Sequence, residues 1–261
     1  MGVRHPPATR CSPESETMAT VVMTNGEPGM QPDMRRTFHE QLEDLKTDVI
    51  RLGGKTVELI SGATLALLDS DLGVAKQTIQ NDEPIDELTH GVEDTCFSLL
   101  ARQQPMAGDL RTILATLRIA HELERSADLS VNIAKATRRL YPTPLDPKVR
   151  GIIDQMGRQA ANQTRLALDA YADSDPTWAS ALADMDDAMD DLTKSLFRYI
   201  LSLAPADEAA VQQAVQIALV GRHFERIADH AVTIAERVVF MATGEYPMNE
   251  ADRPEVAGDT R

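Results

Sequence analysis

The second half of the chain repeats the pattern of the first half, and this duplication constrains the fold more than any other feature. Pairs of similar segments recur at an offset of 104 residues (173 − 69 and 186 − 82) and then of 101 residues (229 − 128). The corresponding segments are 69–71 with 173–175, 82–88 with 186–192, and 123–128 with 224–229, and Pro205 follows where Pro105 stood. Such a period predicts two copies of one structural unit.

Each copy carries the periodicity of packed helices. Phe38, Leu42, Leu45, Val49 and Leu52 are spaced by four, three, four and three residues, which is the seam of a helix in a bundle. Aromatic residues make up only 4% of the chain, and its abundant Ala, Leu, Glu and Arg favour helix over sheet.

Turn signals divide this helical pattern into segments. We expect a helix over 34–68, a turn at 69–71, a short helical piece, a helix over 84–104 and a long helix over 110–140. Three prolines within 141–147 predict a linker, and Gly244 is placed to end the last helix. The predicted fold is therefore all-α, with two tandem, pseudo-symmetric three-helix bundles at 34–140 and 148–244. Residues 1–33 and 245–261 are predicted to be disordered tails.

Composition excludes several classes of function. The formal net charge of −15, from 41 acidic and 26 basic residues, repels nucleic acid and anionic lipid headgroups and suits cations or basic partner proteins. Only Cys11 and Cys96 are present, which indicates a reducing, cytoplasmic location. No apolar run approaches the ~20 residues that cross a bilayer. No phosphate-binding loop, catalytic triad or zinc spacing is found, so no enzyme is predicted.

Carboxylates continue an apolar stripe on the third helix of each copy. The stripe of Leu110, Ile113, Leu114 and Leu117 leads at helical spacing to Glu124 and Asp128. The second copy does the same, and each second helix adds an acidic pair at the same spacing of four. The predicted metal-binding residues are Asp82, Asp86, Glu124, Asp128, Asp186, Asp190, Glu225 and Asp229.

Carboxylates gathered on a helix seam repel one another, so they stay hydrated, become protonated or hold a cation. Ligands of oxygen alone suit hard cations, and we expect magnesium, manganese or iron. The competing explanation is ordinary surface ion pairing, with Arg125 and Arg226 as partners.

Other candidate sites are weaker. Glu87 and His90 have the Glu-x-x-His spacing of di-iron bundles, but the second copy has Lys194 in place of the histidine. His230 corresponds to Leu129, which indicates a surface role. Cys96 lies among apolar residues and is predicted to be a buried small hydrophobic residue rather than a nucleophile.

Several motifs make the chain resemble the PhoU family, the accessory proteins of phosphate-specific transport. These are Glu-Arg-Ser-Ala-Asp at 124–128, Glu-Arg-Ile-Ala-Asp at 225–229, Arg-Leu-Gly-Gly-Lys-Thr-Val-Glu at 51–58, and the segment 101–111. The resemblance extends from about 34 to 244. It implies two symmetric three-helix bundles, metal ions or clusters held by the repeated acidic motifs, and frequent homodimers.

The resemblance also implies a non-enzymatic negative regulator of phosphate uptake and of the phosphate-starvation response. The implied partners are the cytosolic subunits of the phosphate ABC transporter and a sensor histidine kinase. Asn162 stands where Glu58 stands in the first unit, Ser126 corresponds to Ile227, and residues 1–33 have no place in the family pattern. A metal-dependent enzyme and a metal-free helical scaffold remain alternatives.

Overall fold

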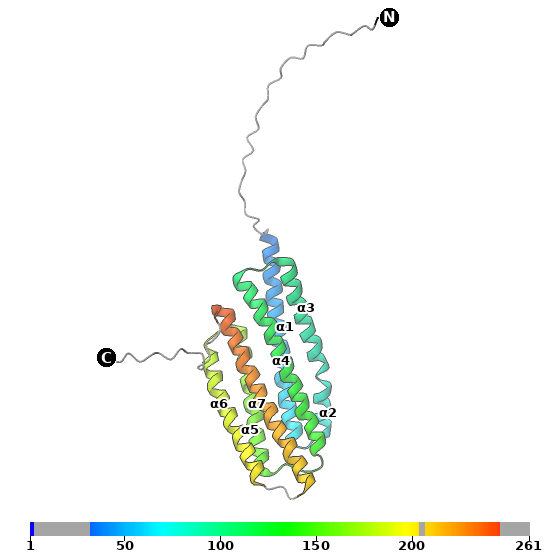
Figure 1. Ribbon diagram of the computed structural model, residues 1–261, viewed down its shortest axis with the longest axis vertical. Helices are drawn as coiled ribbons and strands as arrows, with labels where there is room; N and C mark the ends of the chain where they lie inside the picture. Colours follow the sequence, from blue (N-terminus) through cyan, green and yellow to red (C-terminus); the bar gives the residue numbers. More distant parts are fainter. Residues whose placement is uncertain (3–31, 204–206, 246–261) are drawn as a thin grey trace, which may run out of the picture.

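The structure is a computed structural model and describes residues 1–2, 32–203 and 207–245. The disorder predicted for 3–31 and 246–261, and the correspondence of Pro205, lie outside the described residues. Within them the chain forms helices and no strand, and the helices run along the long axis of the molecule (Figure 1). They are α1 (Pro32–Leu68), α2 (Leu72–Gln80), α3 (Glu83–Gln103), α4 (Ala107–Leu140), α5 (Pro147–Asp173), α6 (Trp178–Ser202) and α7 (Glu208–Thr243).

Local sequence signals place the helix ends. Asp71 caps α2 by accepting hydrogen bonds from the backbone N–H groups of Gly73 and Val74, at 2.7 and 3.0 Å. Asp146 caps α5 in the same way, and Pro147 occupies its first turn. Gly244 ends α7 with φ +84°, a left-handed conformation that glycine adopts without steric cost.

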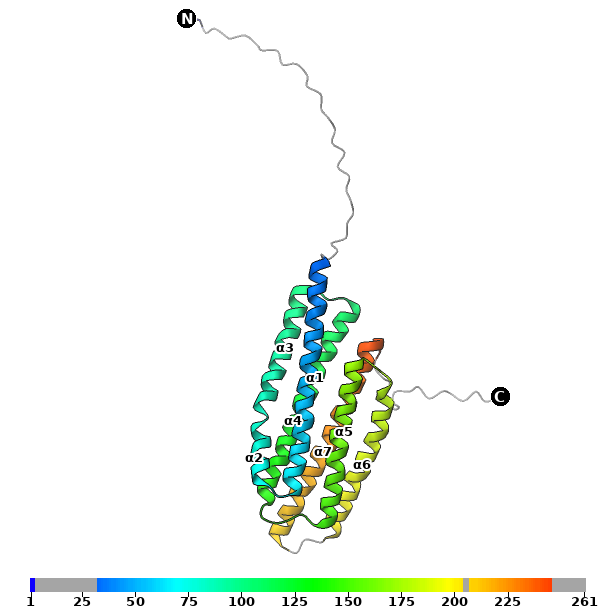
Figure 2. The ribbon, with the colours of Figure 1, turned by 180° about the vertical axis from the view of Figure 1, so that it is seen from behind.

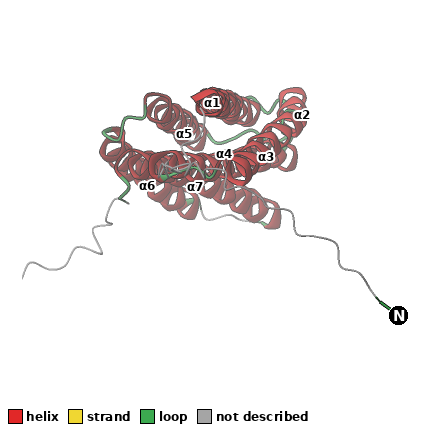
Figure 3. Ribbon diagram, turned by 90° about the horizontal axis from the view of Figure 1, so that it is seen from above, coloured by secondary structure: helices red, strands yellow, loops and turns green. Residues whose placement is uncertain are grey.

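The two units pack into one continuous core. The first unit comprises α1, α2, α3 and α4, and the second comprises α5, α6 and α7. Viewed along the long axis, α1 and α5 lie side by side on one face, and α4 packs against α7 behind them (Figure 3). Figure 2 shows α1 and α5 side by side from that face. The core seam predicted on α1 is confirmed, since Phe38, Leu45, Val49 and Leu52 are buried. The predicted fold class, two pseudo-symmetric helical bundles, is also confirmed.

Two equivalent contacts join α1 to α5. A Cβ added at Gly53 would lie 2.2 Å from Cδ2 of Leu168, and one added at Gly157 would lie 2.4 Å from Cγ2 of Thr64. Both pairs of positions differ by the repeat offset, since 53 corresponds to 157 and 64 to 168. Glycine therefore lets a side chain of each unit lie directly on the helix backbone of the other.

The second helix differs between the units. It is interrupted at Asn81 and Asp82 in the first unit, where Pro84 occupies the first turn of α3. In the second unit, Ala188 corresponds to Pro84, and α6 continues through this position without a break. Proline removes a backbone donor and clashes with the preceding turn, so it favours a break that alanine does not require.

The predicted acidic stripe does not face the interior. Of the predicted stripe, Ile113 is buried, but Leu110 and Leu114 are 36% and 40% exposed, and the buried face of α4 also includes Leu123 and Ala127. Because α4 contacts α1, α3 and α7, its buried face is wide and is centred away from the stripe. The expectation of carboxylates lining the interior is therefore wrong, and they lie at the edge of the buried face.

Candidate functional site: two acidic clusters

The eight predicted carboxylates form two separate groups. The first acidic cluster comprises Asp82, Asp86, Glu124 and Asp128, from the start of α3 and the middle of α4. Burial raises the pKa of Asp82, and the charges of Asp86 and Asp128 raise it further. Glu124 also has a raised pKa, first because of burial and then because of Asp128. These effects place the four carboxylates within electrostatic reach of one another across two helices.

The second acidic cluster comprises Asp186, Asp190, Glu225 and Asp229, from α6 and α7. Burial raises the pKa of Asp186 to about 6, and Asp229, Asp190 and Glu225 contribute repulsion. Asp229 has a raised pKa as well, mainly through burial. The eight predicted residues therefore lie in two groups of four, of which Asp86, Asp128 and Asp229 are exposed.

Each glutamate has a basic neighbour one turn earlier. In the first cluster, Nδ1 of His121 lies 3.6 Å from Oε2 of Glu124. In the second, Nη1 of Arg222 lies 2.5 Å from Oε1 of Glu225. Arg125, a partner in the competing ion-pair explanation, is among the charges that lower the pKa of the neighbouring Glu122.

Arg226, the corresponding arginine of the second unit, acts on His223. Its charge acts with burial to lower the pKa of His223, on the side of α7 that faces Arg139. Successive helix positions are about 100° apart, so adjacent residues point to different sides. The first cluster therefore has a histidine as its near base, and the second has an arginine.

The donor chemistry of both clusters fits a hard cation. All donors are carboxylate oxygens, and burial, followed by repulsion from the neighbouring carboxylates, raises the pKa of Asp186. The arrangement does not enclose an ion, however. Across the described residues, no three His, Cys, Asp or Glu side chains converge in a way that could hold a metal. Metal binding at these residues stays a prediction.

His230 contradicts its predicted surface role. Its side chain is 7% exposed, and Nδ1 lies 2.8 Å from Oε2 of Glu122 on α4. This contact lowers the pKa of Glu122. Leu129, the counterpart of His230 in the first unit, is also buried, but its apolar side chain cannot form such an ion pair. The comparison of the two halves missed this pair because Glu122 lies in the first unit and His230 in the second, and only the packing of α4 on α7 joins them.

The remaining candidates fall away. Cys96 is fully buried and burial raises its pKa to about 12, as expected for a structural residue rather than a nucleophile. Glu87 and His90 are exposed on α3. None of the described helices is long and apolar enough to cross a membrane.

These observations define a duplicated helical-bundle protein with one acidic cluster per unit. The model of the PhoU domain matches the chain twice, at residues 49–137 and 153–238. The chain belongs to the PhoU family.

Relatives and solved structures agree with this assignment. The phosphate-specific transport system accessory protein PhoU homolog 2 of Mycobacterium tuberculosis is 38% identical over 215 residues, covering 82% of this chain and 100% of the relative. Homolog 1 of Mycobacterium leprae is 36% identical over 218 residues, covering 83% and 97%. The crystal structure of PhoU from Pseudomonas aeruginosa matches with a TM-score of 0.76 and 30% identity, covering 80% of this chain and 100% of that one.

Proposed function

We propose that this chain is a non-enzymatic accessory protein of phosphate transport that restrains phosphate uptake and the phosphate-starvation response. The observation that carries this proposal is the match, over 97% or more of their own length, to relatives named as phosphate-specific transport system accessory proteins. The solved structure of the similar Streptococcus pneumoniae protein is named as a phosphate transport system regulatory protein, with a TM-score of 0.74 and 29% identity.

The mode of action that fits these features is that of a cytoplasmic adaptor. The proposed partners are the cytosolic subunits of a phosphate ABC transporter and a sensor histidine kinase, and the chain itself would act as a homodimer. Its acidic surface, with a net charge of −15, suits basic partner surfaces and disfavours direct contact with anionic lipid.

Hard cations at the two acidic clusters form the second part of the proposal. When bound, a cation would offset the repulsion between carboxylates of two helices and would fix α3 against α4 and α6 against α7. The support is the repetition of four carboxylates in each unit and the raised pKa of Asp82 and Asp186. To enclose an ion, the half-exposed carboxylate side chains of each cluster would have to rearrange.

The regulatory role is tested by deleting the gene and following a phosphate-starvation reporter in phosphate-rich medium. We expect the reporter to remain active, and reintroduction of the wild-type gene to silence it. Unchanged reporter activity after deletion would refute the role. Capture of the tagged chain from cells grown at high and at low phosphate would identify its partners.

Cation binding is tested by elemental analysis of protein purified without chelators. Glu124→Ala/Asp128→Ala and Glu225→Ala/Asp229→Ala should each lose metal relative to wild type. Asp169→Ala/Asp173→Ala provides a matched control, because this exposed pair has the same spacing on α5. Equal metal content in the wild type and all variants would refute cation binding at the clusters and favour the metal-free helical scaffold. Phosphatase and oxidase assays on metal-loaded protein would reveal the enzyme alternative.

A further inference from the structure

Three exposed apolar side chains recur at the same positions of both units. The equivalent pairs, at the offsets of 104 and 101, are Phe97 with Leu201, Leu110 with Val211, and Leu114 with Val215. The first apolar patch comprises the three residues of the first unit, and the second apolar patch those of the second unit. All six side chains are exposed, most of all Leu201 at 78%. A group of exposed apolar residues that recurs in both units indicates a surface that contacts another molecule.

The first apolar patch continues the surface that carries the first acidic cluster. On α3, Phe97 follows Asp86 by 11 residues (97 − 86), which at about 100° per residue brings both to the same side of the helix. On α4, Leu114 precedes Asp128 by 14 residues (128 − 114), and the two directions differ by about 40°. Because Asp86 and Asp128 both raise the pKa of Asp82, the two helix faces are turned to the same side of the unit.

The two helices of the first patch also match in height. Sγ of Cys96 lies 3.9 Å from the carbonyl oxygen of Ile113, so these residues of α3 and α4 are at the same level. Phe97 and Leu114 are their immediate neighbours in sequence. The patch is therefore one surface made by two helices.

The second apolar patch has the same geometry. Leu201 follows Asp190 by 11 residues on α6 (201 − 190), and Val215 precedes Asp229 by 14 residues on α7 (229 − 215). Asp190 and Asp229 both raise the pKa of Asp186, and the two helices lie side by side (Figure 1). The second patch and the second acidic cluster therefore share one surface as well.

The second patch extends further than the first. Leu219 is 45% exposed and continues the row of Val211 and Val215 by one helical turn, where the first unit has Arg118 at the equivalent position. Val211 and Val215 also border a groove of about 700 Å³ on the α4 side, whose wall includes the exposed side chain of Tyr141. The second unit thus presents the larger apolar area.

Each surface is apolar at one end and acidic at the other. Val215 and Glu225 are 10 residues apart (225 − 215), which is about 15 Å along α7. A second copy of this chain could cover the apolar side chains, but with a net charge of −15 it would add negative charge instead of neutralising the carboxylates. A basic partner complements both ends of the surface.

We propose that the second apolar patch and the second acidic cluster together dock an amphipathic helix of a partner protein, with apolar side chains at one end and Lys or Arg at the other. About three helical turns separate the two ends of such a helix. Burial of its apolar side chains supplies affinity, and its basic side chains fix the direction in which it lies. A cation bound at the cluster would compete with the basic end.

This inference rests on the proposed adaptor function, because it names the surface and the chemistry by which the chain would hold a partner. The first unit presents the same surface in a smaller form, in which Arg118 would repel a basic helix.

Site-specific photocrosslinking in cells tests the occupant. A photoreactive amino acid is placed at Val215 and, as the control, at Leu65, which is 56% exposed on α1. We expect Val215 to crosslink to a helical segment of another protein with the stated order of apolar and basic residues, and Leu65 not to do so. Any other result from Val215 would overturn the proposal, whether no crosslink, a second copy, a lipid, a segment without this pattern, or the segment that Leu65 also captures.

The crosslinked segment, prepared as a synthetic peptide, is then titrated calorimetrically into the chelator-treated full chain. Val211→Ser/Val215→Ser should weaken binding by about tenfold, because two apolar contacts are lost. Glu225→Gln should weaken it by about threefold at low salt and by less at high salt, because an exposed charge is removed. Binding equal to wild type in either of these variants would overturn the proposal.

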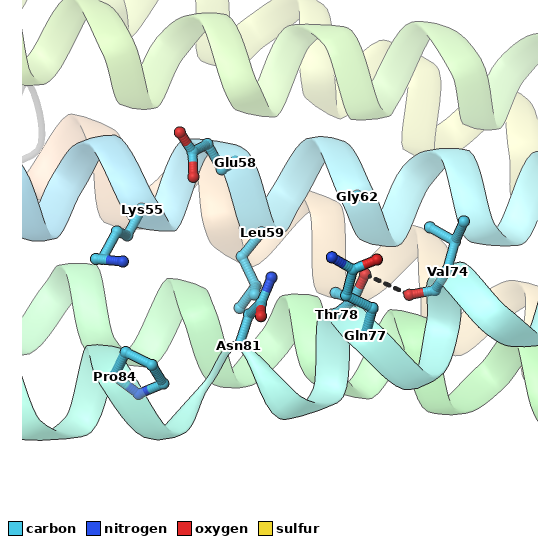
Figure 4. A pocket seen from close by; sticks show the side chains of 9 residues that line it. All are labelled: Lys55, Glu58, Leu59, Gly62, Val74, Gln77, Thr78, Asn81 and Pro84. Atoms are coloured by element: carbon cyan, nitrogen blue, oxygen red, sulfur yellow. Dashed lines mark hydrogen bonds between the residues drawn. The ribbon is translucent and has the colours of Figure 1, made fainter.

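Two control variants change the same chemistry elsewhere. Glu58→Gln removes one negative charge from the groove between α1 and the junction of α2 with α3, which Lys55 also lines (Figure 4). Leu65→Ser removes an exposed apolar side chain from α1. Both should bind the peptide like wild type, and a loss equal to that of the surface variants would refute a localised docking site.

The docking surface and the proposed function fail in different ways. If gene deletion leaves the starvation reporter unchanged, the proposed function fails, while the crosslink and the titration still decide the docking surface. If deletion activates the reporter but Val215 captures no such helix, the docking surface alone is refuted.

Discussion

The contact between Gly53 and Leu168 gives the sharpest test of how the two units are joined. A Cβ at residue 53 would lie 2.2, 2.4 and 2.8 Å from three side-chain atoms of Leu168, and this leucine is only 7% exposed. Leu168 must therefore move within a packed region. Overpacking of this kind costs about 1–3 kcal/mol, whereas replacing glycine by alanine inside a helix gains up to about 1 kcal/mol.

The expected result for Gly53→Ala is a free energy of unfolding about 1 kcal/mol below that of wild type. Gly54→Ala is the matched control. It lies in the same helix turn, and nothing comes within 4 Å of its added Cβ. Gly54→Ala should raise the free energy of unfolding by up to about 1 kcal/mol, so the two neighbouring substitutions should differ by about 2 kcal/mol.

Urea unfolding followed by circular dichroism at helical wavelengths measures both values. The double variant Gly53→Ala/Leu168→Ala should lose less stability than the sum of its single variants, by about 1 kcal/mol, because the shortened side chain makes room for the new methyl group. If Gly53→Ala is stabilised as much as Gly54→Ala, the close approach of α1 and α5 at this point is refuted.

Three further results are expected from single substitutions. Asp186→Asn should stabilise the chelator-treated protein above pH 6 by about 1 kcal/mol after allowance for solvent screening, and much less near pH 4. Because the pKa of Asp186 is raised to about 6, the folded state binds this proton more tightly than the unfolded state, and the stability of the wild type falls as the pH rises from about 4 to 6. Urea unfolding at a series of pH values tests this, and equal effects of Asp186→Asn at about pH 4 and above about pH 6 would contradict it. Glu122→Gln should lower the free energy of unfolding at about pH 7, because contact with His230 lowers the pKa of Glu122 and stabilises its charged form. This loss should shrink as the pH falls below the ordinary glutamate range, and an equal loss of stability at all pH values would contradict the reasoning. Tyr171→Phe should cost about 1 kcal/mol in thermal unfolding, since its hydroxyl lies 2.9 Å from that of buried Thr116, and an unchanged midpoint would count against this hydrogen bond.

The pairing of carboxylates within one helix could be predicted because it follows from spacing. Carboxylates four residues apart share a helix face whatever the helix packs against. The approach of Asp186 to Asp229, and of Asp82 to Asp128, joins different helices and depends on how these helices pack. The depth of the carboxylates could not be predicted, because it depends on how many neighbouring helices cover α4 and α7.

The sequence by itself determined the helices, their ends and the duplication, because periodicity, capping residues and prolines act over a few residues. Only the tertiary structure decided which side chains of different helices come into contact. It buried His230 beside Glu122 and laid Leu168 on Gly53. Each of these contacts joins different helices, and the pattern within a single helix does not specify which side chain will meet it from its neighbour.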